Sequence, residues 1–306
     1  MGGVPGPGAA TSPIGSAAVP RYDLNGRVAL VTGAARGIGY ETAREIHARG
    51  GRVVLADLDA DEAAAAAARL GERALGLRAD VSETGEVEGA VAAATERFGG
   101  LDVAVANAGI APAEATTVRQ ADPGEWERII DVNLVGVWRT ARAALPQVVE
   151  RRGQIIVVSS VYAFFNGVLN SAYAATKAGV ESFGRALRTE LAPHGASAGV
   201  AYFGFIDTRM VRDTFDSEDP VAERFRERVP AFAARRLPPA AAGVAIADGL
   251  EKRAPRIMAP GWLRGFAAMR GLLNPVLDRR MEREADLIDL VREAEREPER
   301  AAPPPP

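Results

Sequence analysis

The chain has 306 residues, of which 47% are hydrophobic and 25% charged, so it can form one large α/β domain or two small ones. Its formal charge of −3 shows no basic excess for binding nucleic acid, and without cysteine it has neither a disulfide framework nor a thiolate metal site. His47 and His194 lack metal-ligand spacing, and no apolar run reaches the length of a membrane-spanning helix, so we expect no metal, no nucleic acid and no integral membrane segment.

The chain begins with a segment rich in Gly, Pro and Ala. This segment lacks the basic start and the long apolar core of a signal peptide. We therefore expect a disordered leader over residues 1–20 and a cytoplasmic protein.

A glycine-rich turn follows the first predicted strand, residues 27–32, and opens a helix that runs to about Arg49. A second strand over residues 52–56 completes a βαβ unit. Glycines let the backbone approach a pyrophosphate closely, and the following helix offers unpaired N–H groups to it. A dinucleotide site is therefore predicted, with a purely structural turn as the alternative. The candidate cofactor-binding residues in the turn are Gly33, Arg36, Gly37, Ile38 and Gly39.

Asp57 ends the second strand, 18 positions after the last glycine of the turn. A carboxylate there can accept hydrogen bonds from the adenosine ribose of NAD and would repel the extra phosphate of NADP. Leu58 follows instead of a cation, while Arg36 in the turn can partly offset the repulsion. NAD is thus favoured over NADP. The alternative role for Asp57 is to cap the next helix, where Asp59 and Asp61 are also available.

A third strand over residues 74–79 leads into Asp80 and Val81, which we take as further cofactor-binding candidates. Asp80 at a strand end can bond the adenine amine, or it can cap the helix that begins near Thr84. The intervening helix over residues 61–70 is nearly all alanine and carries no chemistry.

The fourth strand, residues 102–106, is followed by Asn107, Ala108 and Gly109. Asn beside a small residue and a Gly is typical of a turn, and here it is expected both to fix the turn and to flank the cofactor. Asn133 lies inside a predicted long helix over residues 123–150. It requires either a local kink with bound water or a hydrogen bond to nearby loop backbone.

Ser159 and Ser160 end a buried strand over residues 154–158, at the edge of an open α/β sheet where ligands bind. Tyr173 and Lys177 are four positions apart on the next helix, so they share one face and can reach one small molecule. A phenol with a pKa of about 10 is a poor base at neutral pH, and a neighbouring ammonium favours the phenolate. The alternative is a pair that merely decorates a solvated helix.

The remaining chain predicts a sixth strand over residues 197–203, a helix over 238–251 and a seventh strand over 255–259. Residues 209–237 read as irregular, and a stretch that long beside a site is typical of a substrate lid. Apolar residues recur at helical spacing in the last part of the chain, which predicts one amphipathic helix before a Pro-rich tail. They are Leu273, Leu277, Met281, Ile288 and Val291. Its polar face is too acidic for a membrane surface, so docking on its own domain or on another subunit is favoured.

Together these features resemble the short-chain dehydrogenase/reductase family, in its compact branch of one domain, over about residues 22–260. The resemblance implies a doubly wound, seven-stranded parallel sheet with helices on both faces. We expect the catalytic domain over residues 21–261 and a helical extension over residues 262–306. The residues that carry the resemblance are the glycine turn, Asn107-Ala108-Gly109, Asn133, Ser160, Tyr173 and Lys177.

The resemblance also implies roles for single residues. Tyr173 is the acid/base, and Lys177 holds the nicotinamide ribose and lowers the pKa of Tyr173. Ser160 orients the substrate oxygen, Asn133 positions a water that relays protons through Lys177, and Thr208 bonds the nicotinamide carboxamide. Tyr162 is the rival phenol, but no Lys follows it four residues on.

Two features depart from the family pattern. Phe203-Gly204 stands where the family usually has Pro-Gly, which alters the wall beside the nicotinamide. The C-terminal extension replaces the usual short end, which puts the family's common tetramer in doubt, so we expect a homo-oligomer that is either a dimer or a tetramer.

The predicted function is NAD-dependent interconversion of a secondary alcohol and a ketone by hydride transfer, with Tyr173 moving the proton. Aromatic and Met side chains after the site-forming strands favour a lipophilic substrate, although several of them can equally be core residues. They are Phe164, Phe165, Phe203, Phe205, Met210 and Phe215. An NADPH-dependent ketoreductase and a dinucleotide-binding scaffold without turnover are the alternatives.

Overall fold

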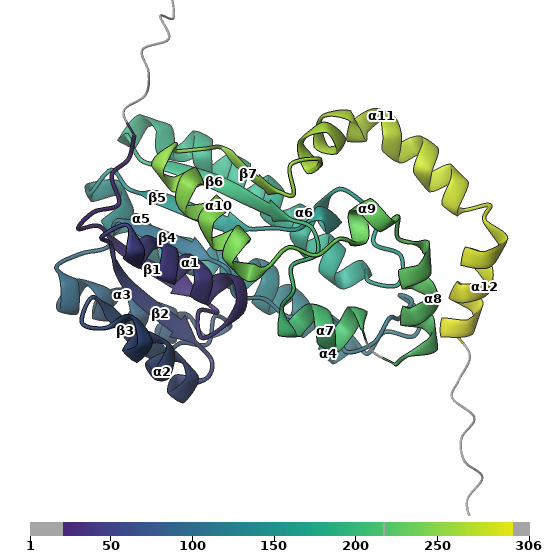
Figure 1. Cartoon of the computed structure of the whole chain (residues 1–306), viewed down its shortest axis with the longest axis horizontal. Helices are drawn as coiled ribbons and strands as arrows, with labels where there is room; N and C mark the ends of the chain where they lie inside the picture. Colours follow the sequence, from purple (N-terminus) through teal and green to yellow (C-terminus); the bar gives the residue numbers. More distant parts are fainter. Residues whose placement is uncertain (1–20, 217, 296–306) are drawn as a thin grey trace, which may run out of the picture.

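A seven-stranded parallel sheet forms the centre of the fold in a computed structural model that describes residues 21–216 and 218–295 (Figure 1). The strand order is β3-β2-β1-β4-β5-β6-β7. Every strand lies within one residue of its predicted range at each end, and the predicted doubly wound sheet is confirmed. The strands are β1 (Val28–Thr32), β2 (Arg52–Asp57), β3 (Ala74–Arg78), β4 (Val103–Ala106), β5 (Gln154–Val158), β6 (Ser197–Phe203) and β7 (Arg256–Ala259).

Helices cover both faces of this sheet. One face carries α1 (Gly37–Ala48), α2 (Ala60–Leu70) and α10 (Pro239–Glu251). The other face carries α3 (Thr84–Phe98), α5 (Gly136–Glu150) and α6 (Ser171–Leu191). The short helix α4 (Pro123–Ile130) precedes a π-helical turn, η1 (Asp131–Val135), and two 3-10 turns follow later in the chain, η2 (Val161–Ala163) and η3 (Ala192–His194).

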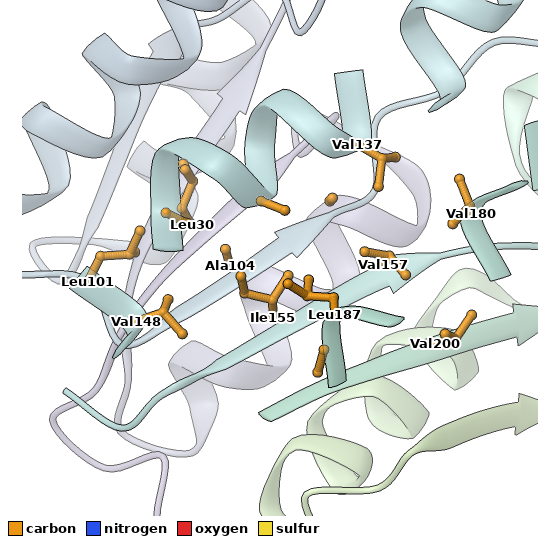
Figure 2. Packing of buried hydrophobic residues seen from close by; sticks show 14 of the residues in the cluster. Leu30, Leu101, Ala104, Val137, Val148, Ile155, Val157, Val180, Leu187 and Val200 are labelled. Atoms are coloured by element: carbon orange, nitrogen blue, oxygen red, sulfur yellow. The ribbon is translucent and has the colours of Figure 1, made fainter. Parts of the chain in front are cut away.

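Two hydrophobic clusters, one on each face, bury the strands from both sides. Leu30 belongs to the cluster beneath α5 and α6, whereas its neighbours Ala29 and Val31 belong to the cluster beneath α1 and α10. Figure 2 shows the first cluster, in which Ile155 and Val157 of β5 face Leu187 of α6. Strands covered on both faces are expected to read as continuous apolar runs, which is why they were found from the sequence.

The strand order reverses between β1 and β4, because β1 is followed outward by β2 while β4 is followed by β5 on the other side. At such a switch point the loops leave the carboxyl ends of neighbouring strands in opposite directions and open a crevice for a ligand. The turns after β1, β4, β5 and β6 therefore meet at one edge of the sheet.

The segment over residues 209–237, predicted to be irregular, is helical. It contains α7 (Arg209–Phe215), α8 (Pro220–Arg228) and α9 (Ala231–Ala234). Thr208 caps α7 by accepting from the Val211 N–H at 3.4 Å, and Asp219 caps α8 with Pro220 at its first position. The prediction was wrong because such caps are typical of helix starts, whereas a mixed charged and apolar composition does not exclude short helices.

The C-terminal extension forms two helices, α11 (Leu263–Met281) and α12 (Ala285–Ala294), instead of the one predicted. α12 packs Leu287 and Leu290 against Leu169 and Val221, which places it on the back of α8. The predicted single apolar stripe is also wrong, because Leu273 is exposed. The leader over residues 1–20 and the Pro-rich tail lie outside the described residues. No helix within residues 21–216 and 218–295 combines the length and apolarity needed to cross a bilayer.

Candidate active site

The turn between β1 and α1 brings backbone close to backbone in a way that only glycine allows. Gly33 has a φ of +63°, and a Cβ there would lie 2.9 Å from the Ala108 Cα. A Cβ at Gly39 would lie 2.1 Å from the Gly33 carbonyl oxygen. No side chain among the described residues caps the start of α1 at Gly37. A glycine cradle beside an uncapped helix start fits a pyrophosphate, so the residues present fit a bound dinucleotide.

Asp57 lies at the tip of β2 and holds the same turn. Its Oδ2 accepts from the Ala35 N–H at 2.9 Å. It does not cap α2, because the cap is Asp59, whose side chain accepts from the Glu62 N–H at 3.0 Å. Glu62 also pairs with Arg36 of the turn. The cation that was expected to offset Asp57 is thus partly neutralised. Nothing in the sequence indicates this pair beyond an acid in the first turn of α2.

Asp80 and Val81 follow β3 at the neighbouring tip. Asp80 accepts from the Ser82 N–H at 2.9 Å and from the Ser82 hydroxyl at 2.6 Å, and it does not cap α3. Burial alone would raise the pKa of Asp80, but the Ser82 hydrogen bonds and the nearby Arg78 hold it below its usual range. Val81 packs against Gly136, where an added Cβ would come within 2.8 Å. Asp80 therefore remains an ionised acceptor at the edge of the crevice.

Asn107 joins the tip of β4 to the glycine turn. Its Nδ2 donates to the carbonyl oxygens of Thr32 and Gly33 at 2.9 and 3.1 Å. The Thr32 hydroxyl in turn accepts from the N–H groups of Asn107 and Ala108, both at 3.1 Å. Thr32, which the sequence did not single out, thereby fixes the distance between the two turns.

Asn133 lies in the π-helical turn η1 and is fully buried. Its Oδ1 accepts from the Ile110 N–H and its Nδ2 donates to the Ile110 carbonyl, each at 2.8 Å. Of the two explanations open from the sequence, the hydrogen bond to loop backbone is therefore the one observed. A Cβ at Gly109 would lie 3.2 Å from Asn133 Oδ1 and 3.6 Å from Lys177 Nζ, so the amide and the ammonium flank this glycine.

Ser160, Tyr173 and Lys177 converge beside this loop. Tyr173 and Lys177 stand on the first two turns of α6, with Lys177 Nζ 5.2 Å from the centre of the Tyr173 ring. Lys177 Nζ donates to the Val158 carbonyl at 3.2 Å, and Ser159 Oγ donates to the Lys177 carbonyl at 2.7 Å. The two serines thus have different roles. Ser159 holds α6 through the Lys177 carbonyl, whereas Ser160 forms a hydrogen bond with Tyr173.

Burial dominates the electrostatics of this group. Desolvation raises the pKa of Tyr173 to about 12; the hydrogen bond with Ser160 opposes this increase and the adjacent Tyr162 adds to it. Desolvation also lowers the pKa of Lys177 to about 8. The net pKa of Tyr173 is therefore raised where a decrease was expected, because burial is the dominant cause. Burial also disfavours the charged form of Lys177. Removal from water therefore destabilises both the Tyr173 phenolate and the Lys177 ammonium.

Thr208 follows β6 and reaches the glycine turn, with its methyl carbon 3.5 Å from where a Cβ of Gly37 would be. Phe203 is buried in the cluster beneath α1 and is not among the residues that line the cavity beside Tyr173. Thr208 is therefore placed at the predicted cofactor edge, while Phe203 serves the core.

A cavity of about 120 Å³ opens next to Tyr173 and Ser160 and is walled in part by α7 and α8. Phe205 and Met210 line it as predicted, together with Val168, Leu169 and Phe225, which the sequence did not single out. Other members of the predicted aromatic set lie elsewhere. Phe164 is core and stacks on Tyr202, Phe165 is 40% exposed, and the side chain of Phe215 is outside the described residues.

A family model described as short chain dehydrogenase matches residues 27–219. Cis-4-hydroxycyclohexanecarboxylate dehydrogenase of Sinomonas cyclohexanicum is 39% identical over 188 residues, covering 60% of this chain and 75% of that protein. 3-oxoacyl-[acyl-carrier-protein] reductase of Escherichia coli is 34% identical over 197 residues, covering 64% of this chain and 80% of that protein.

A hydroxysteroid enzyme and a solved structure agree with these matches. The 3-alpha-(or 20-beta)-hydroxysteroid dehydrogenase of Mycobacterium tuberculosis is 38% identical over 188 residues, covering 61% of this chain and 72% of that protein. The crystal structure of 3-ketoacyl-(acyl-carrier-protein) reductase from Brucella melitensis complexed with NADH superposes with a TM-score of 0.68 at 30% identity. It covers 77% of this chain and 97% of that chain.

Proposed function

The chain belongs to the short chain dehydrogenase family and is an oxidoreductase acting on alcohol and ketone groups, and on that premise we propose that it is an NAD-dependent dehydrogenase of lipophilic secondary alcohols. One observation carries the proposal. Tyr173 and Ser160 line an apolar-walled cavity, Lys177 lies beside the Tyr173 ring, and a glycine cradle that fits a dinucleotide lies at the same edge of the sheet. A bound nicotinamide supplies the hydride chemistry, and the protein supplies position and proton transfer.

The Tyr173 phenol is the group that moves the proton. With a pKa of about 12 it is protonated at neutral pH, so it can donate to the oxygen of a ketone during reduction. Ser160 hydrogen-bonds the same phenol and orients the substrate oxygen toward it. In alcohol oxidation the phenol must first lose its proton, a step that Ser160 and a charged Lys177 favour.

Lys177 and Asn133 hold the cofactor side of the site. Lys177 Nζ uses one proton on the Val158 carbonyl, which leaves donors for the hydroxyls of the nicotinamide ribose. Asn133 forms hydrogen bonds with both the N–H and the carbonyl of Ile110. These bonds fix the position of the loop after β4 relative to Lys177. We assign Asn133 this positioning role, with the water relay through Lys177 as a further part of the proposal.

We assign the adenosine side of the site to NAD because two carboxylates lie where the extra phosphate of NADP would approach. Asp57 ends β2, and Glu62 in the first turn of α2 holds Arg36. A phosphate at this point would be repelled by Asp57 and would have to compete with Glu62 for the only cation of the turn.

Replacing Glu62 with Gln should weaken the preference for NAD without removing it. Arg36 and Glu62 are both about half exposed, with side-chain accessibilities of 51% and 46%, so the released cation should raise the ratio of NADP to NAD efficiency by about fivefold at most. The ratio of kcat/KM values for the two cofactors measures this. Glu72→Gln, which removes an equal charge from the exposed turn after α2, should leave the ratio unchanged. An unchanged ratio in Glu62→Gln would show that the ion pair with Glu62 does not prevent Arg36 from binding the extra phosphate of NADP.

The cavity favours a lipophilic substrate. Val168, Leu169, Phe205, Met210 and Phe225 present apolar side chains to it. The relatives act, by their names, on a hydroxysteroid, a hydroxylated ring and an acyl-chain ketone. A ring or chain alcohol of this kind buries apolar surface in the cavity while its oxygen meets Tyr173.

A panel of secondary alcohols tests the proposal directly. With NAD, steroid, terpenoid and long-chain alcohols should produce NADH absorbance at kcat/KM values at least tenfold above those of short alcohols, because each buried methylene contributes roughly 0.8 kcal/mol. Equal or better turnover with NADP would favour the ketoreductase alternative. Dinucleotide binding without turnover on any alcohol or ketone would instead favour a scaffold.

A further inference from the structure

Helix α11 is held against the catalytic domain by its inner face. Phe266 packs on Phe165 with ring centres 4.7 Å apart, and Asn274 donates to the Phe164 carbonyl at 2.9 Å. Arg270 makes two hydrogen bonds to Glu181 of α6, at 2.6 and 2.7 Å. These contacts fix the rotation of the helix about its axis, so the opposite face has a defined direction.

That opposite face is apolar and exposed. Met269, Leu272, Leu273 and Val276 have exposed fractions of 49%, 73%, 36% and 68%. Their spacings of three, four and seven residues place them on one side of the helix. Figure 1 shows α11 at the rim of the molecule, standing away from the sheet. An apolar surface of four neighbouring side chains on the outer side of a helix marks a binding surface.

The charges around this face are basic. Arg264 precedes the four apolar residues, while Arg279 and Arg280 follow them, and all three are exposed. Among the described residues, none of the three forms an ion pair of the kind that ties Arg270 to Glu181. Asp278 is turned inward, where Asn166 donates to it at 2.9 Å.

The acidic residues that made the extension appear unsuited to a membrane belong elsewhere. Glu284 and Glu293 lie beside or within α12, where they pair with Arg228 and Arg224 of α8, while Glu282, Asp286 and Asp289 are exposed after the end of α11. The extension therefore divides by charge, with most of its acids in and next to α12 and its basic residues at the two ends of the outer face of α11. The sequence predicted a single helix, so the acidic residues of α12 were assigned to the same polar face as the arginines of α11.

We propose that the outer face of α11 binds the surface of an anionic lipid bilayer. Its four apolar side chains would enter the boundary of the acyl chains, and the arginines at both ends would meet lipid phosphates. Arginines in a last helical turn also complement the helix dipole, so the charges count here only together with the apolar face between them. This inference stands apart from the proposed function, because it concerns a face that does not line the cavity.

A second copy of the chain fits this face less well. A two-fold, antiparallel pairing of α11 centred on Leu272 would set Arg264 of one copy against Arg280 of the other at both ends of the contact. Like charges juxtaposed across an interface are unfavourable, whereas phosphate groups are complementary to all three arginines. The charge pattern therefore selects the lipid surface.

Sedimentation with vesicles tests the proposal. The full chain should sediment with vesicles of equal parts phosphatidylcholine and phosphatidylglycerol, and weakly or not at all with phosphatidylcholine alone. Arg279→Gln combined with Arg280→Gln should reduce the apparent affinity about fivefold for each arginine, the effect of about 1 kcal/mol per charge. Leu272→Glu with Val276→Glu should abolish binding at unchanged alcohol turnover.

Val118→Glu supplies the matched control, because Val118 is 74% exposed on another surface and should leave vesicle binding unchanged. Absence of binding to either vesicle, or binding that the α11 variants do not alter, would overturn the proposal. So would a dimer in lipid-free solution that Leu272→Glu with Val276→Glu dissociates, since the face would then be an interface between copies. Thermal melting of each variant checks that the fold is intact.

Discussion

Replacement of Tyr173 with Phe should leave dinucleotide binding intact and reduce turnover by about a thousandfold, the range expected for loss of a general acid. The substitution removes one oxygen from a ring held edge-on to Tyr162, with ring centres 5.5 Å apart, so the packing survives. The remaining Ser160 hydroxyl can still accept or donate a hydrogen bond, but its proton is far less available at neutral pH. Stopped turnover with an unchanged dissociation constant for NADH, measured by fluorescence, is the expected result.

Tyr162→Phe is the matched control, because it removes the rival phenol from the same aromatic pair. Tyr162 lines the cavity and has a pKa raised by burial, yet it has no lysine four residues on. Its substitution should change kcat by less than about tenfold, in keeping with a lining residue. If Tyr162→Phe lost activity and Tyr173→Phe retained it, the proton would have to be assigned to Tyr162 and the proposed mechanism abandoned.

The strands and the glycine turn could be predicted because their signals are local. A parallel sheet buried on both faces requires apolar runs such as residues 154–158, and Gly39 is required by contact with a turn six residues earlier. Such constraints can be read from a few neighbouring positions. Asn133 was also identified as needing a partner, but the identity of that partner, the Ile110 backbone, depends on how two loops meet.

The failures concern features that tertiary contacts decide. The pKa of Tyr173 was expected to fall because of the charge four residues away, whereas burial of both groups decides its direction. The pairing of Glu62 with Arg36 joins residues 26 positions apart, which no helical or strand period shows. α8 was missed although its cap signal at Asp219 and Pro220 is local, because the mixed charged and apolar composition of residues 209–237 indicated irregular chain.

Lys177 is one of two lysines among the 37 Lys and Arg residues of the chain. Arginine keeps its proton under all ordinary conditions, whereas a buried lysine shifts its pKa readily and is compact. At position 177 a lysine, unlike an arginine, can therefore lie close to Gly109 and the Tyr173 ring and also gain or lose its proton according to its environment. The lowered pKa of about 8 places this dependence near physiological pH.

Lys177→Met should abolish turnover and at the same time raise the melting temperature. Burial lowers the pKa of Lys177 from 10.5 to about 8, so keeping it charged in the folded state at pH 7 costs about 3 kcal/mol. Met fills similar space without a charge. Loss of the hydrogen bond to the Val158 carbonyl destabilises the variant by about 1 kcal/mol and so reduces the gain. A net gain of about 2 kcal/mol should raise the melting temperature by about 4 °C at pH 7.

The pH dependence separates this electrostatic cause from better packing. Between pH 8 and 10.5 the unfolded chain keeps the Lys177 proton while the folded chain has lost it, so the native protein gains stability as the pH rises through this window. The advantage of Lys177→Met should therefore be complete below pH 8 and disappear toward pH 10.5. Lys252→Met changes the exposed lysine that pairs with Asp248, and it should alter neither turnover nor this pH profile. An advantage of equal size at all pH values would mean that Lys177 is not strained by burial, and that its charge is available to Tyr173 after all.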